Sequence, residues 1–99
     1  MAKIEVQQLD DTKYRVTIEG PEKTTNHEVT IDHPYVERLT GGWHTTESLL
    51  EQTFEFMLER EPNTLILKRF EITTLPRYFP DYERRVKEML DNADQVKHG

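Results

Sequence analysis

The sequence predicts an α+β domain in which an N-terminal three-stranded antiparallel meander is followed by three or four helices. Apolar and polar residues alternate through residues 3–31, which is typical of strands with one covered face. From about residue 45 the apolar spacing changes to the 3.6-residue period of a helix. A chain of 99 residues has room for one domain, which we expect over residues 1–90, and the polar segment 91–99 is predicted to be a disordered tail.

The three predicted strands are short alternating runs joined by turn residues. Their apolar positions are Ile4, Val6, Tyr14, Val16, Ile18, Val29 and Ile31. Asp10 and Asp11 are expected to form the first hairpin turn, and Gly20 with Pro21 opens a looser connection to the third strand. A sheet with one polar face needs its other face covered, so helices must pack on it.

Two helices have clear boundary signals. A short helix is expected from Pro34 to Leu39, because Asp32 can cap its start and Gly41 can end it. A longer helix is expected to begin at Thr45 or Thr46 and to end near Arg60, since proline at position 62 prevents its continuation. Its apolar side chains span about 200° of the helix surface, which predicts the central packing element of the domain. They are Leu49, Leu50, Thr53, Phe54, Phe56, Met57 and Leu58.

The signals after this helix are weaker. We expect a helical segment from Thr64 to Phe70, a turn capped by Thr73, and a final helix from Pro80 or Asp81 to Leu90. The apolar face of the final helix is predicted to consist of Tyr82, Val86, Met89 and Leu90.

Composition limits the compartment and the partners. The chain has no cysteine, and its 13 basic and 19 acidic side chains give a formal net charge of −6. The N-terminal residues lack the apolar stretch of a secretory signal, and no apolar run is longer than Leu65–Leu67, which is far too short to cross a membrane. We therefore predict a cytoplasmic protein without membrane association, and the negative charge argues against general nucleic-acid binding.

The sequence offers little for metal or nucleophilic chemistry. The one cluster of possible metal ligands is His27, Glu28, Asp32 and His33. Strand alternation places His27 and Glu28 on opposite faces, so no metal or other cofactor is predicted. The lone serine, Ser48, lies inside a predicted helix, so the residues favour a protein that is not an enzyme. A small enzyme or ligand-binding site around Trp43 and His44 remains a weaker alternative.

Charge is distributed unevenly along the second half of the chain. Glutamates recur every four residues on the central helix, where each adjacent like-charged pair costs about 0.2–0.5 kcal/mol. This acidic stripe consists of Glu47, Glu51, Glu55 and Glu59. Residues 68–87 contain six basic and three acidic side chains, so we expect this basic segment to pair with the stripe.

These features predict a small non-catalytic protein-interaction or regulatory module. Its candidate interaction surface is Glu47, Glu51, Glu55, Glu59, Arg77, Tyr78, Phe79, Tyr82, Arg84 and Arg85. The partner is expected to be another protein or a second copy, in a homodimer that buries apolar surface of Phe54, Leu58, Tyr78 or Phe79. Because aromatic residues are interspersed in the basic segment, a nucleic-acid-binding regulator that uses residues 68–87 is the alternative.

Two short elements carry a family resemblance. The sequence LEREP occupies positions 58–62 and YFPDY occupies positions 78–82, both within residues 53–83. This stretch resembles a family of small uncharacterised bacterial proteins that have a helix ending in LEREP and a YFPxY element further on. The resemblance implies a bacterial cytoplasmic single domain with strands first and helices second, and it implies no activity.

Overall fold

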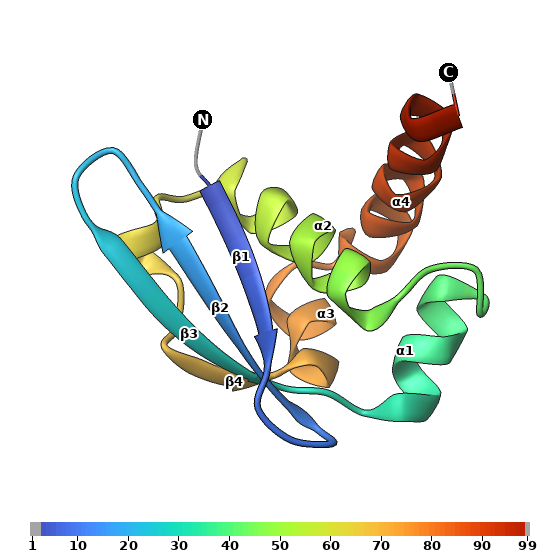
Figure 1. The fold of residues 1–99 in the computed structure, drawn as a ribbon, viewed down its shortest axis with the longest axis horizontal. Helices are drawn as coiled ribbons and strands as arrows, with labels where there is room; N and C mark the ends of the chain where they lie inside the picture. Colours follow the sequence, from blue (N-terminus) through green and yellow to red (C-terminus); the bar gives the residue numbers. More distant parts are fainter. Residues whose placement is uncertain (1–2, 99) are drawn as a thin grey trace.

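The computed structural model describes residues 3–98, with side chains described as far as residue 93. Helices pack against a four-stranded sheet (Figure 1). The strands, in their order across the sheet, are β1 (Lys3–Gln8), β2 (Lys13–Glu19), β3 (Thr24–Thr30) and β4 (Arg69–Glu71). The first three are antiparallel, and β4 runs parallel to β3. The α+β class and the N-terminal antiparallel meander are therefore confirmed.

The helical segments that the structure describes follow the meander and flank β4. They are α1 (His33–Thr40), α2 (Thr46–Leu58), the 3₁₀ turns η1 (Asn63–Leu65) and η2 (Ile72–Thr74), α3 (Leu75–Tyr78) and α4 (Tyr82–His98). α2 contacts both β1 and α4, and α1 packs against α2 and α4. Within the described residues, no helix has the length and apolar character needed to span a membrane.

Local hydrogen bonds explain where the early elements begin and end. The carboxylate of Asp10 accepts the amides of Thr12 and Lys13 at 2.9 and 2.8 Å, which closes the β1–β2 hairpin. Asp32 caps α1 by accepting the Tyr35 amide at 2.9 Å, and Gly41 ends the helix in the left-handed region with φ of 63°. The predicted hairpin turn and the predicted short helix are confirmed.

The end of α2 is fixed by one arginine. Arg60 lies just beyond the helix, donates to the Phe56 carbonyl at 3.1 Å, and pairs with Asp81 at 2.6 Å. Its guanidinium also lies 3.7 Å from the centre of the Phe56 ring. These contacts connect the last turn of α2 to the start of α4.

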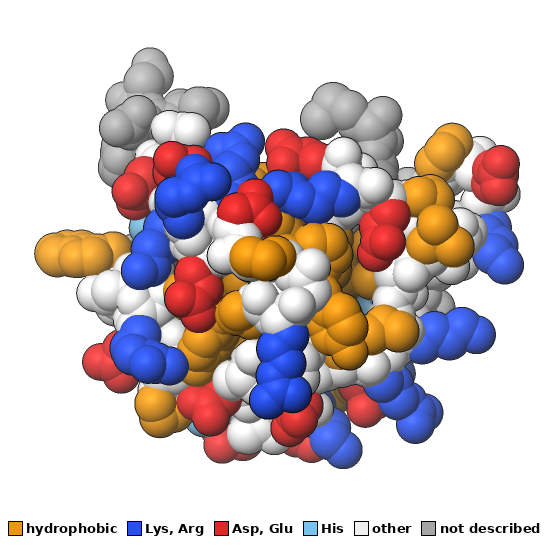
Figure 2. Space-filling view, turned by 180° about the vertical axis from the view of Figure 1, so that it is seen from behind, with side chains coloured by type: hydrophobic (Ala, Val, Ile, Leu, Met, Phe, Trp, Pro, Cys, Tyr) orange, Lys and Arg blue, Asp and Glu red, His pale blue; other side chains and the backbone are white. Residues whose placement is uncertain are grey.

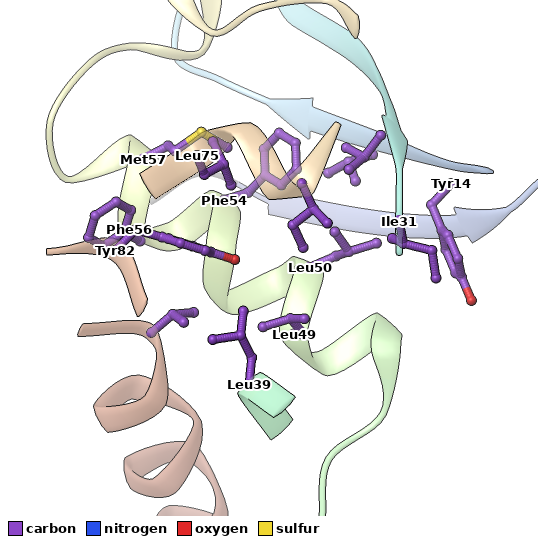
Figure 3. Close-up of a cluster of buried hydrophobic side chains, with 14 of the residues drawn as sticks. Tyr14, Ile31, Leu39, Leu49, Leu50, Phe54, Phe56, Met57, Leu75 and Tyr82 are labelled. Carbon is purple, nitrogen blue, oxygen red and sulfur yellow. The ribbon is translucent and has the colours of Figure 1, made fainter. Parts of the chain in front are cut away.

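The core is centred on α2, as its apolar arc predicts. Figure 3 shows side chains projecting from this helix toward the strands and toward the neighbouring helices. The buried residues of α2 are Leu49, Leu50, Thr53, Phe54, Phe56 and Met57. Thr53 is satisfied inside the core, because its hydroxyl donates to the Leu49 carbonyl at 2.7 Å and accepts from the Tyr82 hydroxyl at 2.8 Å.

Two predictions of secondary structure are wrong. The helix expected from Thr64 to Phe70 is replaced by η1 and the short strand β4, because the open edge of β3 binds this segment: the Glu28 amide donates to the Lys68 carbonyl at 2.7 Å. The last helix continues past Leu90 to His98, so the expected disordered tail is helical as far as it is described. No proline or glycine occurs between Leu90 and the final residue to stop it.

Candidate functional site

Three exposed apolar side chains lie around one groove. Leu65, Leu67 and Tyr78 are 66, 56 and 64% exposed, although each is a large hydrophobic residue. Figure 2 shows hydrophobic side chains gathered at the centre of one face, with acidic and basic side chains around them. A contiguous apolar patch on a small protein is typical of an interaction site.

The groove has a volume of about 280 Å³ and mainly apolar walls. This apolar groove is lined by Met57, Glu61, Leu65, Ile66, Leu67, Phe70, Thr74, Leu75, Tyr78 and Phe79. The deeper residues are continuous with the core, since Ile66 and Leu75 are buried and the ring of Phe79 meets Phe56 edge-on at 5.5 Å. Glu61 is its one charged lining residue.

Asn63 anchors the loop that carries the exposed leucines. Its side chain is buried, and its amide nitrogen donates to the Lys23 carbonyl at 3.0 Å and to the Thr25 hydroxyl at 2.9 Å. Gly20 allows this close approach, because a side chain at that position would overlap the Asn63 carboxamide. The start of the loop is therefore fixed to the β2–β3 hairpin.

His27 fixes the other end of the loop. A carbonyl can only accept a hydrogen bond, so the 2.8 Å contact to Leu67 requires that Nδ1 of His27 carries the proton. Nε2 then accepts from the Thr25 hydroxyl at 2.8 Å. Burial lowers the pKa of His27, which keeps the ring in this neutral form.

These anchors define the character of the groove. Asn63 and His27 hold the backbone from both sides, and Ile66 points into the core between them. The side chains of Leu65 and Leu67 are left facing outward on a rigid loop. An apolar surface that is already ordered binds a partner with a smaller entropy cost than a flexible one.

The acidic stripe is only partly paired. Glu59 lies 3.6 Å from Arg85 and 3.5 Å from Arg60, as expected from the basic segment. Glu51 and Glu55 make no ion pair with any residue that the structure describes, and they line a separate hollow near β1. The expected pairing of the whole stripe is therefore wrong, because only its last member reaches α4.

The other predicted surface residues divide between surface and core. Tyr78 lies in the apolar groove, Phe79 is half-buried in its wall, and Arg77 is exposed on α3. Tyr82 is fully buried, so its place in the predicted surface is wrong: it belongs to the apolar face of α4 and bonds to Thr53.

The remaining two arginines of that surface also have a partner within α4, in addition to the contact of Arg85 with Glu59. Arg84 and Arg85 each lie 3.6 Å from the same carboxylate oxygen of Glu88. Exposed pairs of this kind contribute little to stability, about 0–1 kcal/mol each.

A second, open depression lies beside Trp43 and His44. Trp43 is 86% exposed, and the side chain of His44 is largely buried with Nε2 3.7 Å from the Asp91 carboxylate. Arg38 and Lys87 line the same depression of about 580 Å³. Arg38 lies in the last turn of α1, where its charge complements the helix dipole, and Lys87 belongs to α4. The depression brings an imidazole and a carboxylate together, and Thr40 also lines it.

The important leucines of the groove escaped the sequence analysis. In the sequence, the run Leu65–Leu67 indicates only a segment too short to cross a membrane. A short signal is present, since the apolar Phe70 and Ile72 alternate with the charged Arg69 and Glu71, and the structure buries Ile72 and half-buries Phe70. That alternation is typical of an extended segment with outward-facing neighbours.

Comparison of the chain with protein-family models, with curated proteins and with solved structures finds no match. The resemblance of residues 53–83 to small bacterial proteins therefore stays a prediction. In the described part of the chain, no three histidine, aspartate or glutamate side chains are placed to hold a metal ion.

Proposed function

We propose that this protein is a non-catalytic protein-interaction module whose apolar groove binds large apolar side chains of a partner protein. One observation carries the proposal: Leu65 and Leu67 are exposed on a loop whose backbone is fixed by the buried side chains of Asn63 and His27. Exposed leucines beside an apolar groove are typical of an interaction site, and their anchored backbone lowers the entropy cost of binding a partner.

The size of the groove favours side chains over a metabolite. Its volume of about 280 Å³ is at the small end of the range of about 300–1,000 Å³ in which small-molecule sites usually fall. One or two aromatic or aliphatic anchors fit a groove of this size, which is how interfaces concentrate their binding energy.

The alternative, nucleic-acid binding through residues 68–87, has less support. Stacking sites need several exposed aromatic faces, yet Tyr82 is buried and Phe70 and Phe79 are half-buried. Tyr78 is the one aromatic of this segment that is largely exposed. A homodimer through the groove remains a prediction, in which Tyr78 and Phe79 are available and the fully buried Phe54 is not. A bacterial source and a cytoplasmic location also remain predictions from the sequence.

The proposal is tested by selecting short random peptides on the immobilised protein and measuring their affinities in solution. We expect peptides with aromatic or leucine anchors and Kd values in the micromolar range, weakened at least about tenfold by Leu67→Asp. The matched control is Leu9→Asp, an exposed leucine outside the groove. Peptides that bind both variants as well as the parent protein would refute the groove as the binding surface. Sedimentation of the parent protein and of Leu67→Asp shows in parallel whether a second copy occupies the groove.

A further inference from the structure

The outer edge of β1 is open, because β1 is the first strand of the sheet and no other strand in residues 3–98 pairs with it on that side. The Leu9 amide donates to the Lys13 carbonyl, and bonded pairs alternate along an antiparallel ladder. The register places Gln7 opposite Arg15 and Glu5 opposite Thr17, so these pairs bond to β2. The amides and carbonyls of Ile4, Val6 and Gln8 therefore face away from the sheet, a row of donors and acceptors that can pair with another strand.

A hollow lies beside this edge, between β1, α2 and α4. This edge hollow has a volume of about 300 Å³ and is lined by Ile4, Glu51, Gln52, Glu55 and Met89. Two of its lining residues are carboxylates without an ion pair among the described residues, and two are apolar. These two carboxylates, Glu51 and Glu55, belong to the part of the acidic stripe that does not pair with the basic segment.

The edge and the hollow together specify what fits. Ile4 lies opposite Ile18 and shares the helix-facing side of the sheet with it. In a strand added beside β1, the side chain opposite Ile4 points to the same side and enters the edge hollow. A lysine or arginine there rests its aliphatic stem on Ile4 and Met89 and places its cationic head at Glu51 and Glu55.

We propose that the open edge of β1 binds an extended basic segment of a partner protein as a fifth strand, with Glu51 and Glu55 receiving its helix-facing lysine or arginine side chains. Main-chain hydrogen bonds supply the attachment, and the edge hollow selects the sequence. This surface is separate from the apolar groove, which lies by β4 at the opposite edge of the sheet.

A second copy of this chain is the wrong occupant for this edge. Twofold pairing of β1 with itself brings the Glu51 and Glu55 carboxylates of both copies toward one another across the shared edge. Each copy also carries a formal net charge of −6. The acidic residues therefore oppose edge-to-edge self-association while favouring a cationic strand.

The test uses a capped synthetic peptide of about seven residues in which lysine and threonine alternate, so that all lysines share one face. We expect it to bind the full chain, and we expect Glu51→Gln with Glu55→Gln to weaken the affinity about tenfold at low salt. Glu47→Gln is the matched control, since this glutamate belongs to the same stripe but does not line the edge hollow. Equal affinities for the double variant and the parent would overturn the proposal.

Two further measurements separate strand addition from simple charge attraction. Amide hydrogen exchange of Ile4, Val6 and Gln8 should slow in the complex, and a peptide with alternate backbone amides methylated should lose binding. Unchanged exchange, or full binding by the methylated peptide, would show that the peptide is held by charge alone and would refute the added strand. Leu67→Asp should leave this binding intact, so failure of the apolar groove and failure of the β1 edge are told apart.

Discussion

Gly20 and Asn63 should be strongly coupled in stability. A Cβ added at Gly20 would overlap Oδ1 of Asn63 and lie 2.8 Å from its Cγ. The Asn63 side chain cannot move aside freely, because it is buried and bonded to Lys23 and Thr25. Gly20→Ala must therefore break that anchor or distort the hairpin, which costs about 2–3 kcal/mol.

A double-mutant cycle measures this coupling. Asn63→Ala alone should cost about 2 kcal/mol, from two hydrogen bonds at about 1 kcal/mol each. In the Asn63→Ala background the space is open, so Gly20→Ala should change the free energy of unfolding by less than about 0.5 kcal/mol. The coupling energy is then about 2 kcal/mol, well above the ~0.5 kcal/mol within which independent sites add.

Urea unfolding followed by far-UV circular dichroism is the assay, because the exposed Trp43 is a poor reporter of the core. Gly42→Ala is the control: this glycine has φ of 78° and no neighbouring atoms, so its cost should be the same with or without Asn63. If Gly20→Ala costs the same in both backgrounds, the anchor described for the loop is incorrect.

Three further outcomes follow from the structure. Burial lowers the pKa of His27 from its ordinary value of 6.5. Below that pH the unfolded chain binds a proton that the folded chain does not. Lowering the pH should therefore destabilise the parent protein more than it destabilises His27→Gln, and the extra loss should be at most about 1.4 kcal/mol per pH unit. Parallel pH profiles of the two proteins would contradict this. Trp43→Ala should change the free energy of unfolding by less than about 0.5 kcal/mol because the side chain is exposed, and a larger loss in urea unfolding would mean that it packs on the domain. Arg85→Glu should destabilise by about 1 kcal/mol at low salt through Glu59, and by clearly less at high salt; an effect independent of salt would rule out the pair as its cause.

The elements that the sequence predicted correctly are those with local causes. Asp10 closes the β1–β2 turn by accepting the amides two and three residues after it. Asp32 caps α1 by accepting the amide of Tyr35, three residues after it. The start of α2 is similarly capped by Thr45. Each signal and its partner lie within one turn of chain, so both could be read from the sequence together.

The errors occur where a distant part of the chain decides the outcome. β4 has three residues, too few to show a period, and its conformation depends on pairing with Glu28–Thr30 about forty positions earlier. The predicted pairing of the acidic stripe with the basic segment was wrong for a related reason. Its spacing was visible, but only the orientation of α4 determines that Glu59 meets Arg85 while Glu51 and Glu55 lie toward β1.

The two proposed surfaces differ in the physical force on which each depends. Binding in the apolar groove removes leucine and tyrosine surface from water, so salt should change its affinity little. Binding at the β1 edge depends partly on Glu51 and Glu55, which are screened as salt rises over a Debye length of about 8–10 Å at physiological strength. Because the surfaces lie at opposite edges of the sheet, two partners can be bound at once. Rising salt should release the partner at the β1 edge before the partner in the apolar groove. Joint loss of both partners at the same salt concentration would mean that the two peptides share one site.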